Sequence, residues 1–172
     1  TAELYDPVTG MVRTVTPMTV PRAGATATRL GNGLVLVVGG EQPTAAETWD
    51  PALDTWTTTP PLSVRRTRHT ATLLADGGVL VLGGTDGTSH HATGERFDPR
   101  ARTWTRITNM PTPRVGHTAT LLADGRVLVA GGNTATSPVI GTAPAATAVV
   151  WSPVTGQWST VGPMDVSRQD HG

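Results

Sequence analysis

The chain has 172 residues, of which 37% are hydrophobic, so it is long enough to enclose a sizeable core. Its 13 basic residues are all Arg and are balanced by 13 acidic residues, which argues against nucleic acid as a partner. Cys is absent, which excludes disulfides and thiolate metal sites, and no apolar run is long enough for a membrane span.

Two half-units alternate from the N-terminus onward. The first is TAELYDPVTGMVRTVTPMTV at residues 1–20, and related segments begin at residues 46, 94 and 148. The second is ATATRLGNGLVLVVGG at 25–40, which returns at 69–84 and 117–132. The aromatic anchors Tyr5, Trp49, Phe97 and Trp151 are 44, 48 and 54 residues apart. Other anchors keep these spacings, which establishes an internal repeat: Val12, Trp56, Trp104 and Trp158, and also Arg22, Arg66, Arg114 and Arg168.

The second half-unit predicts a β-hairpin, seen most clearly in HTATLLADGRVLVAGG (117–132). Asp124 and Gly125 are expected to take the positive φ angles of the turn. Residues 127–129 are apolar on both faces, which predicts a strand covered on both sides. The pair Gly131-Gly132 is expected to let a bulky neighbour, an aromatic side chain, approach the backbone.

Each full unit therefore predicts four short antiparallel strands, which we call a (HTATLL), b (VLVLGG), c (ETWD) and d (TWTTT). Four such strands in a unit of about 40–50 residues are typical of one blade of a β-propeller. The expected fold class is all-β.

The Gly-Gly pair after strand b, the aromatic on strand c and the Trp on strand d resemble the kelch repeat over essentially the whole chain. The sequence pattern R-x-x-H-T-A-T-L-L-x-D-G-x-V-L-V-x-G-G is similar to that of bacterial kelch propellers, including the propeller domain of galactose-oxidase-like enzymes. This resemblance implies part of a single kelch propeller domain over 1–172. Its expected blade pieces are about 1–20, 21–64, 65–112, 113–166 and 167–172.

Three full blades with partial blades at each end do not close a ring. An open arc would expose apolar faces, so we expect the remaining blades to come from the same protein or from a second chain.

The connections between strands indicate which rim of the propeller binds. The a–b and c–d turns are nearly uniform, whereas the b–c loops at 41–45, 85–94 and 133–148 differ in length and composition. Divergent loops on one rim of a uniform scaffold are typical of recognition, so the b–c and d–a rim is the predicted binding face.

The repeated arginines Arg22, Arg66, Arg114 and Arg168 are candidate ligand-binding residues, because a guanidinium binds carboxylates well. The structural alternative is an ion pair with the Glu that opens strand c, at Glu3, Glu47 and Glu95. Val149 replaces this Glu in the last blade, so Arg114 is the arginine expected to be freest for a ligand.

His90 and His91, with Asp86, form a second candidate set in the 85–94 loop. A His pair with a carboxylate suits a transition metal, but adjacent side chains point apart, so the preferred interpretation is a solvated loop.

Two further repeated positions have structural interpretations. His69, His117 and His171 share one position, where convergence on a metal competes with hydrogen bonding inside each blade. Trp56, Trp104 and Trp158 invite a sugar-stacking interpretation, but their fixed register on strand d favours a place in the core near Gly-Gly.

The preferred function is a kelch-propeller scaffold that binds a protein or glycan without a cofactor. The alternative is the propeller portion of a secreted galactose-oxidase-like carbohydrate oxidase, whose copper site would lie outside these residues. One Tyr and no Cys leave this chain without the tyrosines and the Cys–Tyr crosslink that the resemblance implies for such a copper site. The Thr-rich, weakly charged composition favours a secreted protein but leaves the compartment open.

Overall fold

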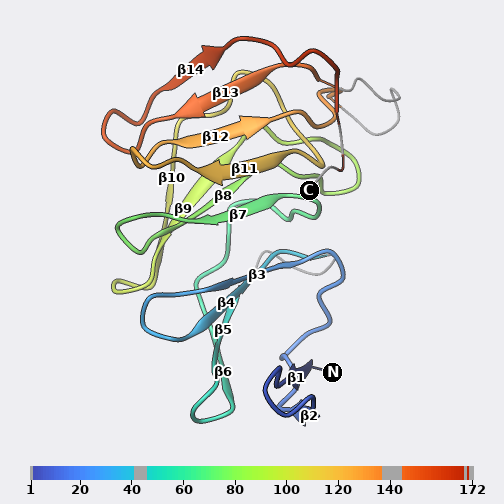
Figure 1. Cartoon of the computed structure of the whole chain (residues 1–172), viewed down its shortest axis with the longest axis vertical. Coiled ribbons are helices and arrows are strands. Elements are labelled where there is room, and N and C mark those ends of the chain that lie inside the picture. Colours follow the sequence, from blue (N-terminus) through green and yellow to red (C-terminus); the bar gives the residue numbers. More distant parts are fainter. Residues whose placement is uncertain (1, 41–45, 137–144, 169, 171–172) are drawn as a thin grey trace.

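The computed structural model describes residues 2–40, 46–136, 145–168 and 170. These residues form three four-stranded antiparallel sheets and one two-stranded hairpin, stacked along the long axis of the molecule (Figure 1). No helix in the described part of the chain is long and apolar enough to cross a membrane. The predicted all-β fold class is confirmed, with three full four-stranded sheets and a two-stranded partial unit at the N-terminal end.

Each sheet follows the order of the chain, so consecutive strands are hydrogen-bonded neighbours. The N-terminal hairpin is β1 (Ala2–Tyr5) and β2 (Val12–Val15). Blade 1 is β3 (Thr26–Arg29), β4 (Val35–Val38), β5 (Glu47–Asp50) and β6 (Thr55–Thr58). Blade 2 is β7 (Thr70–Leu73), β8 (Val79–Leu82), β9 (Gly94–Asp98) and β10 (Thr103–Arg106). Blade 3 is β11 (Thr118–Leu121), β12 (Val127–Ala130), β13 (Ala148–Trp151) and β14 (Trp158–Val161). The a strands β3, β7 and β11 contact one another in sequence.

The hairpin predicted at 117–132 is present, with Thr118 opposite Ala130 and Leu121 opposite Val127. Its turn differs from the expectation, because Gly125 has a positive φ of 82° and Asp124 does not. Asp124 instead accepts a hydrogen bond from the Arg126 amide at 3.0 Å through its side chain. A single Gly in the left-handed region is therefore sufficient for this turn.

Two apolar clusters hold the blades together, one on each face of blade 2. Val79 and Val81 of β8 face blade 1, whereas Leu80 and Leu82 face blade 3, and all four side chains are fully buried. Strand b is therefore covered on both sides, as its unbroken apolar sequence predicts. The core lies between blades rather than within any one of them.

The Gly-Gly pairs permit close contact between blades, but the predicted aromatic neighbour is wrong. A Cβ atom added to Gly83 would lie 2.4 Å from the Arg114 carbonyl oxygen and 2.7 Å from the His117 ring. Gly39 stands in the same relation to Arg66 and His69. The residues that approach the glycines are therefore the Arg and His of the next blade.

The strand-d tryptophans pack at the edge of the core rather than inside it. Trp104 and Trp158 are half-buried against the two clusters, and Trp104 lies beside Phe97 with ring centroids 4.9 Å apart. Trp158 donates its indole N–H to the Thr108 carbonyl of the preceding blade at 2.9 Å. The expectation of fully buried core residues is corrected to a place at the seam between blades.

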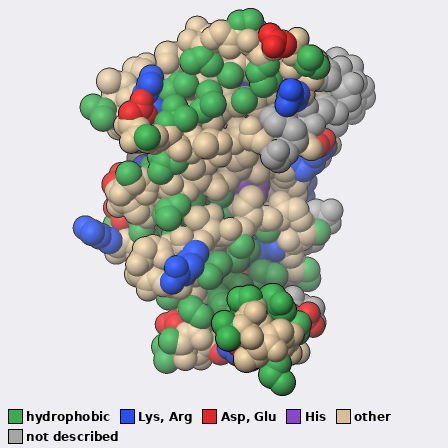
Figure 2. All heavy atoms as spheres, in the orientation of Figure 1, with side chains coloured by type: hydrophobic (Ala, Val, Ile, Leu, Met, Phe, Trp, Pro, Cys, Tyr) green, Lys and Arg blue, Asp and Glu red, His purple; other side chains and the backbone are tan. Residues whose placement is uncertain are grey.

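Hydrophobic side chains gather at both ends of the stack, over the N-terminal hairpin and over blade 3 (Figure 2). On the hairpin, Tyr5 is 61% exposed and Met11 is 71% exposed. On blade 3, Val161 is 41% exposed. These ends carry the apolar surface that the inner blades bury against each other.

Candidate functional site

The predicted binding rim carries the b–c loops and the d–a connections, which lie at the ends of the sheets opposite the a–b and c–d turns. The loop at 41–45 and residues 137–144 of the longest loop lie outside the described residues. The described part of this rim consists of the d–a connections, the 85–94 loop and the described residues 133–136 and 145–148 of the longest loop.

Arg66 and Arg114 each bond to the preceding blade through the main chain and to their own blade through the side chain. The carbonyl oxygens of Arg66 and Arg114 accept hydrogen bonds from the amides of Gly40 and Gly84, at 3.0 and 2.8 Å. The Arg66 side chain turns into its own blade and donates to the Gly83 carbonyl at 2.6 Å. We call this arrangement the Arg–Gly clip. The spacing between the repeated Arg and the Gly-Gly pair thus reflects contact between blades.

Arg22 and Arg66 form the ion pairs of the structural alternative. Arg22 donates to one Glu47 oxygen from Nε at 2.9 Å and from Nη2 at 2.8 Å, with both side chains buried. Arg66 lies 3.3 Å from Glu95 and also donates to Thr93. Neither guanidinium reaches the surface of the rim.

Burial and hydrogen bonding shift the pKa values of Arg66 and Glu47. Burial lowers the pKa of Arg66, and the charge of Glu95 partly offsets this effect. Burial alone would raise the pKa of Glu47, but hydrogen bonds from Thr19 and Arg22 outweigh it and the pKa is lowered. These hydrogen bonds therefore favour the ionised form of the Glu47 carboxylate in its buried position.

Among the described residues Arg114 has no carboxylate partner, as the replacement by Val149 predicts, but it is not exposed to a ligand. It is 1% exposed and donates to the Gly131 and Thr147 carbonyls at 2.6 and 3.0 Å and to the Thr147 hydroxyl at 2.9 Å. Burial lowers its pKa. Arg168 differs from the other three, since its side chain is exposed while its carbonyl accepts the Gly132 amide at 2.7 Å.

His90 and His91 point apart, as expected, but they are docked rather than solvated. The His90 ring contacts the Ala135 carbonyl at 2.7 Å, and its amide donates to the Thr136 carbonyl at 3.0 Å. The His91 ring contacts the Arg65 carbonyl at 3.2 Å and lies 3.7 Å from Asp86. The two residues hold the 85–94 loop against both of its neighbours.

Hydrogen bonds from Thr88 and Ser89 outweigh the desolvation of Asp86 and lower its pKa to about 2. Burial is the main cause that lowers the pKa of His91. Within the described residues no group of three His, Asp or Glu side chains lies close enough to hold a metal ion.

His69 and His117 each bond to the preceding blade, which corrects the expectation of a bond within their own blade. The His69 ring is 2.9 Å from the Thr26 hydroxyl, and the His117 ring is 3.0 Å from the Thr70 hydroxyl. Burial, followed by the charge of Arg66, lowers the pKa of His69 to about 4. Both residues are seam residues; His171 lies outside the described part of the chain.

Sequence reasoning missed an exposed ion pair on this rim, between Arg68 and Asp170. Both residues have positive φ, of 54° and 51°, and they lie two residues after a repeated Arg. Gly116 is the equivalent residue of the intervening repeat, two residues after Arg114, and it also has a positive φ. A Cβ atom on Gly116 would lie 2.2 Å from the Asp170 carboxylate. The glycines at this repeat position, Gly24 and Gly116, indicate in the sequence that the backbone here takes a left-handed conformation.

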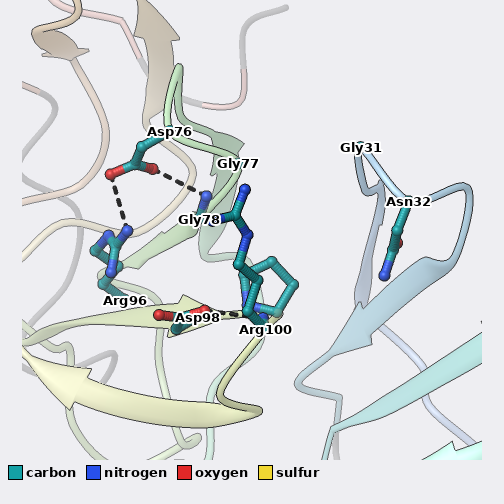
Figure 3. A pocket seen from close by; sticks show the side chains of 9 residues that line it. Gly31, Asn32, Asp76, Gly77, Gly78, Arg96, Asp98 and Arg100 are labelled. Carbon is teal, nitrogen blue, oxygen red and sulfur yellow. Dashed lines mark hydrogen bonds and ion pairs between the residues drawn. The ribbon is translucent and has the colours of Figure 1, made fainter.

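A second feature lies on the opposite rim, where a pocket of about 570 Å³ opens between the turns of blades 1 and 2 (Figure 3). Asn32 lines one side, and Asp76, Arg96 and Arg100 line the other. From the sequence, this rim was expected to carry only the uniform a–b and c–d turns and no binding site.

Comparisons with known proteins agree with this architecture. The kelch motif matches residues 66–111, which include the strands of blade 2. The solved structure of YjhT, a bacterial kelch propeller protein, is similar to this chain with a TM-score of 0.73 and 19% sequence identity. The similarity covers 88% of this chain and 54% of YjhT, so the chain spans about half the length of that protein. No curated protein matches the sequence.

Proposed function

We propose that this chain, which carries a kelch motif in a stack of propeller blades, is a binding scaffold for a protein or glycan. The binding face is the rim of the b–c and d–a loops. The repeated strands provide a fixed frame, and the loops on this rim differ from blade to blade.

The observation that carries the proposal is the joining of two variable loops into one surface. His90 of the 85–94 loop bonds to Ala135 and Thr136 at the start of the third b–c loop. Loops that support each other across a blade boundary present a pre-organised surface, which lowers the entropic cost of binding.

Charged side chains on this rim can form hydrogen bonds with polar groups of a bound partner. Arg65 and Arg68 are exposed, and the Arg68 side chain is half exposed even though it pairs with Asp170. An exposed guanidinium binds carboxylates or hydroxyl groups of a partner through several N–H donors.

The remaining blades come from the same protein or from a second chain in this proposal. The exposed apolar side chains on the N-terminal hairpin and on blade 3 support it, because such faces are buried where blades are neighbours.

The test uses the full-length protein on a glycan array and in affinity capture from its source. A ligand of the rim is expected to bind the wild type and to bind about tenfold more weakly to Arg68→Ala. Arg126→Ala is the matched control, because Arg126 forms an exposed ion pair with Asp124 on the opposite rim. Equal binding by the wild type and Arg68→Ala, with a loss in Arg126→Ala, would refute the proposed face.

A further inference from the structure

The pocket of Figure 3 lies between the a–b turn of blade 1 and the turns of blade 2. It is lined by Gly31, Asn32, Asp76, Gly77, Gly78, Arg96, Asp98, Pro99 and Arg100. Turns a–b and loops b–c lie at opposite ends of strand b, so this pocket is separate from the binding face proposed above. Its volume of about 570 Å³ is within the range of small-molecule sites.

Two departures from the repeat create this pocket. Gly78 occupies the position of Leu34 in blade 1 and Arg126 in blade 3. Arg96 occupies the position of Thr48 and Val150. A Cβ atom on Gly78 would lie 2.8–2.9 Å from three atoms of the Arg96 guanidinium, so the glycine provides the space that this Arg fills. Blades 1 and 3 form the same four strands without either residue, so the blade fold does not require this pair.

The Arg96 side chain is held in place. Its Nη2 donates to Asp76 at 2.8 Å, and the other oxygen of Asp76 accepts the Gly78 amide at 2.9 Å. A fixed guanidinium loses little rotational freedom when it binds a ligand.

The pocket offers donors and acceptors side by side with no net charge. Arg96, Arg100 and the Asn32 amide donate, since the Asn32 oxygen already accepts the Leu34 amide at 3.2 Å. Asp76 and Asp98 accept, and Asp98 uses one oxygen for the Arg100 and Ala101 amides, at 2.8 and 3.2 Å. Figure 3 shows Asn32 across the pocket from Arg100 and the Asp76–Arg96 pair.

We propose that this pocket binds a neutral polyhydroxylated ligand of the size of a mono- or disaccharide. A hydroxyl group donates one hydrogen bond and accepts two, so neighbouring hydroxyls match neighbouring Asp and Arg groups. An anion would meet two carboxylates in the pocket, and a cation would meet two guanidinium groups.

The experiment is an NMR titration of the full-length protein with glucose, galactose, mannose and lactose, and with citrate as an anionic probe. At least one neutral sugar is expected to give saturable shifts of the Asn32, Gly77 and Gly78 amides. Arg96→Ala is expected to weaken this binding about tenfold or more, and Gly78→Leu, which places the blade 1 residue in the pocket, is expected to abolish it.

Arg126→Ala is the matched control, because it removes the Arg of an Arg–Asp pair at the equivalent turn of blade 3 and is expected to leave binding unchanged. Arg100→Ala, on an exposed side chain, serves as a second test if Arg96→Ala fails to fold. The proposal is overturned if no neutral sugar saturates, if citrate alone binds, or if Arg126→Ala weakens binding as much as Arg96→Ala.

Discussion

His69 is a buried, neutral imidazole that ties blade 2 to blade 1. Its ring contacts Thr26, and its Cε1 atom lies only 2.5 Å from where a Cβ atom of Gly39 would be. A protonated ring in this place would lie near the buried Arg66 guanidinium. His69 is therefore a neutral link between the two blades.

The pKa of His69 makes stability depend on pH. Burial lowers it from 6.5 to about 4, so between these values the unfolded chain binds a proton that the folded chain does not. The stabilising contribution is present above pH 6.5 and is lost as the pH falls toward 4. The loss is about 3 kcal/mol by linkage.

Urea unfolding of the wild type and His69→Gln at pH 7 and pH 4.5 measures this effect. The wild type is expected to lose more unfolding free energy than the variant between the two pH values. The same loss in both proteins would show that another group is responsible.

Near Arg114, two residues that form a polar contact at the preceding blade boundary are replaced by apolar residues. In blade 2, Glu95 accepts hydrogen bonds from the Ser63 amide at 3.1 Å and from the Ser63 hydroxyl at 2.9 Å. In blade 3 the equivalent residues are Val149 and Pro111, and Pro has no amide hydrogen to donate. Blade 3 therefore lacks both the carboxylate acceptor, replaced by Val149, and its amide donor, replaced by Pro111.

A double-mutant cycle tests this coupling. Val149→Glu alone is expected to destabilise by about 1–3 kcal/mol, since it removes an apolar contact and buries a carboxylate that has Arg114 beside it but lacks the amide donor. Adding Pro111→Ser restores the donor, so the double variant is expected to be about 1–2 kcal/mol more stable than the sum of the single effects. Urea denaturation measures the cycle, and additive effects would contradict the coupling.

At the scale of the elements, the junction between strand b of one blade and strand a of the next depends on a missing side chain. Gly83 lets the Arg114 carbonyl approach, and this approach allows the Gly84 amide to donate to it at 2.8 Å. The same geometry joins Gly40 to Arg66 at 3.0 Å. The main chain therefore sets the register between blades.

Gly83→Ala is expected to cost about 3 kcal/mol or more, because the added methyl meets a backbone oxygen that cannot move without breaking the junction. Gly77→Ala is the matched control, since Gly77 also has a positive φ but has no atom within 4 Å of an added Cβ. This control is expected to cost about 1 kcal/mol from backbone strain alone. Thermal denaturation compares the two, and equal losses would refute the role of close approach.

Local chemistry explains which elements could be predicted from the sequence. Strand b of blade 2 was predictable because residues 79–82 are apolar on both faces and a Gly turn precedes them. The Arg66–Glu95 pair was predictable because both residues recur with the repeat. The partner of His69 was predicted wrongly, since a repeat shows which positions are equivalent but not which neighbouring unit each side chain contacts.

The features that the sequence did not predict depend on contacts between residues far apart in the chain or on a residue without a side chain. Arg68 and Asp170 are 102 residues apart and meet only because the chain turns through left-handed corners. The pocket in Figure 3 depends on Gly78, which the sequence indicates only as a turn residue.

At the scale of the whole molecule, the stack has apolar surfaces at its two ends. Residues 1–172 produced alone are expected to self-associate through these surfaces. Sedimentation velocity measures this, and Tyr5→Lys combined with Met11→Lys is expected to reduce association because both residues are exposed on the N-terminal hairpin. Leu53→Lys, at an exposed position in a turn of blade 1, is the control. A monomer at all concentrations would contradict the expectation.

The Arg–Gly clip has a consequence for how such a protein is altered over generations. Its contacts between units use a carbonyl, an amide and the absence of a side chain, and none of these depends on the rest of the unit. A blade that carries Gly-Gly after strand b can therefore be followed by any blade that carries the repeated Arg before strand a. Gene duplication or recombination at this boundary would change the number of units, or exchange one for another, without a new joint having to evolve.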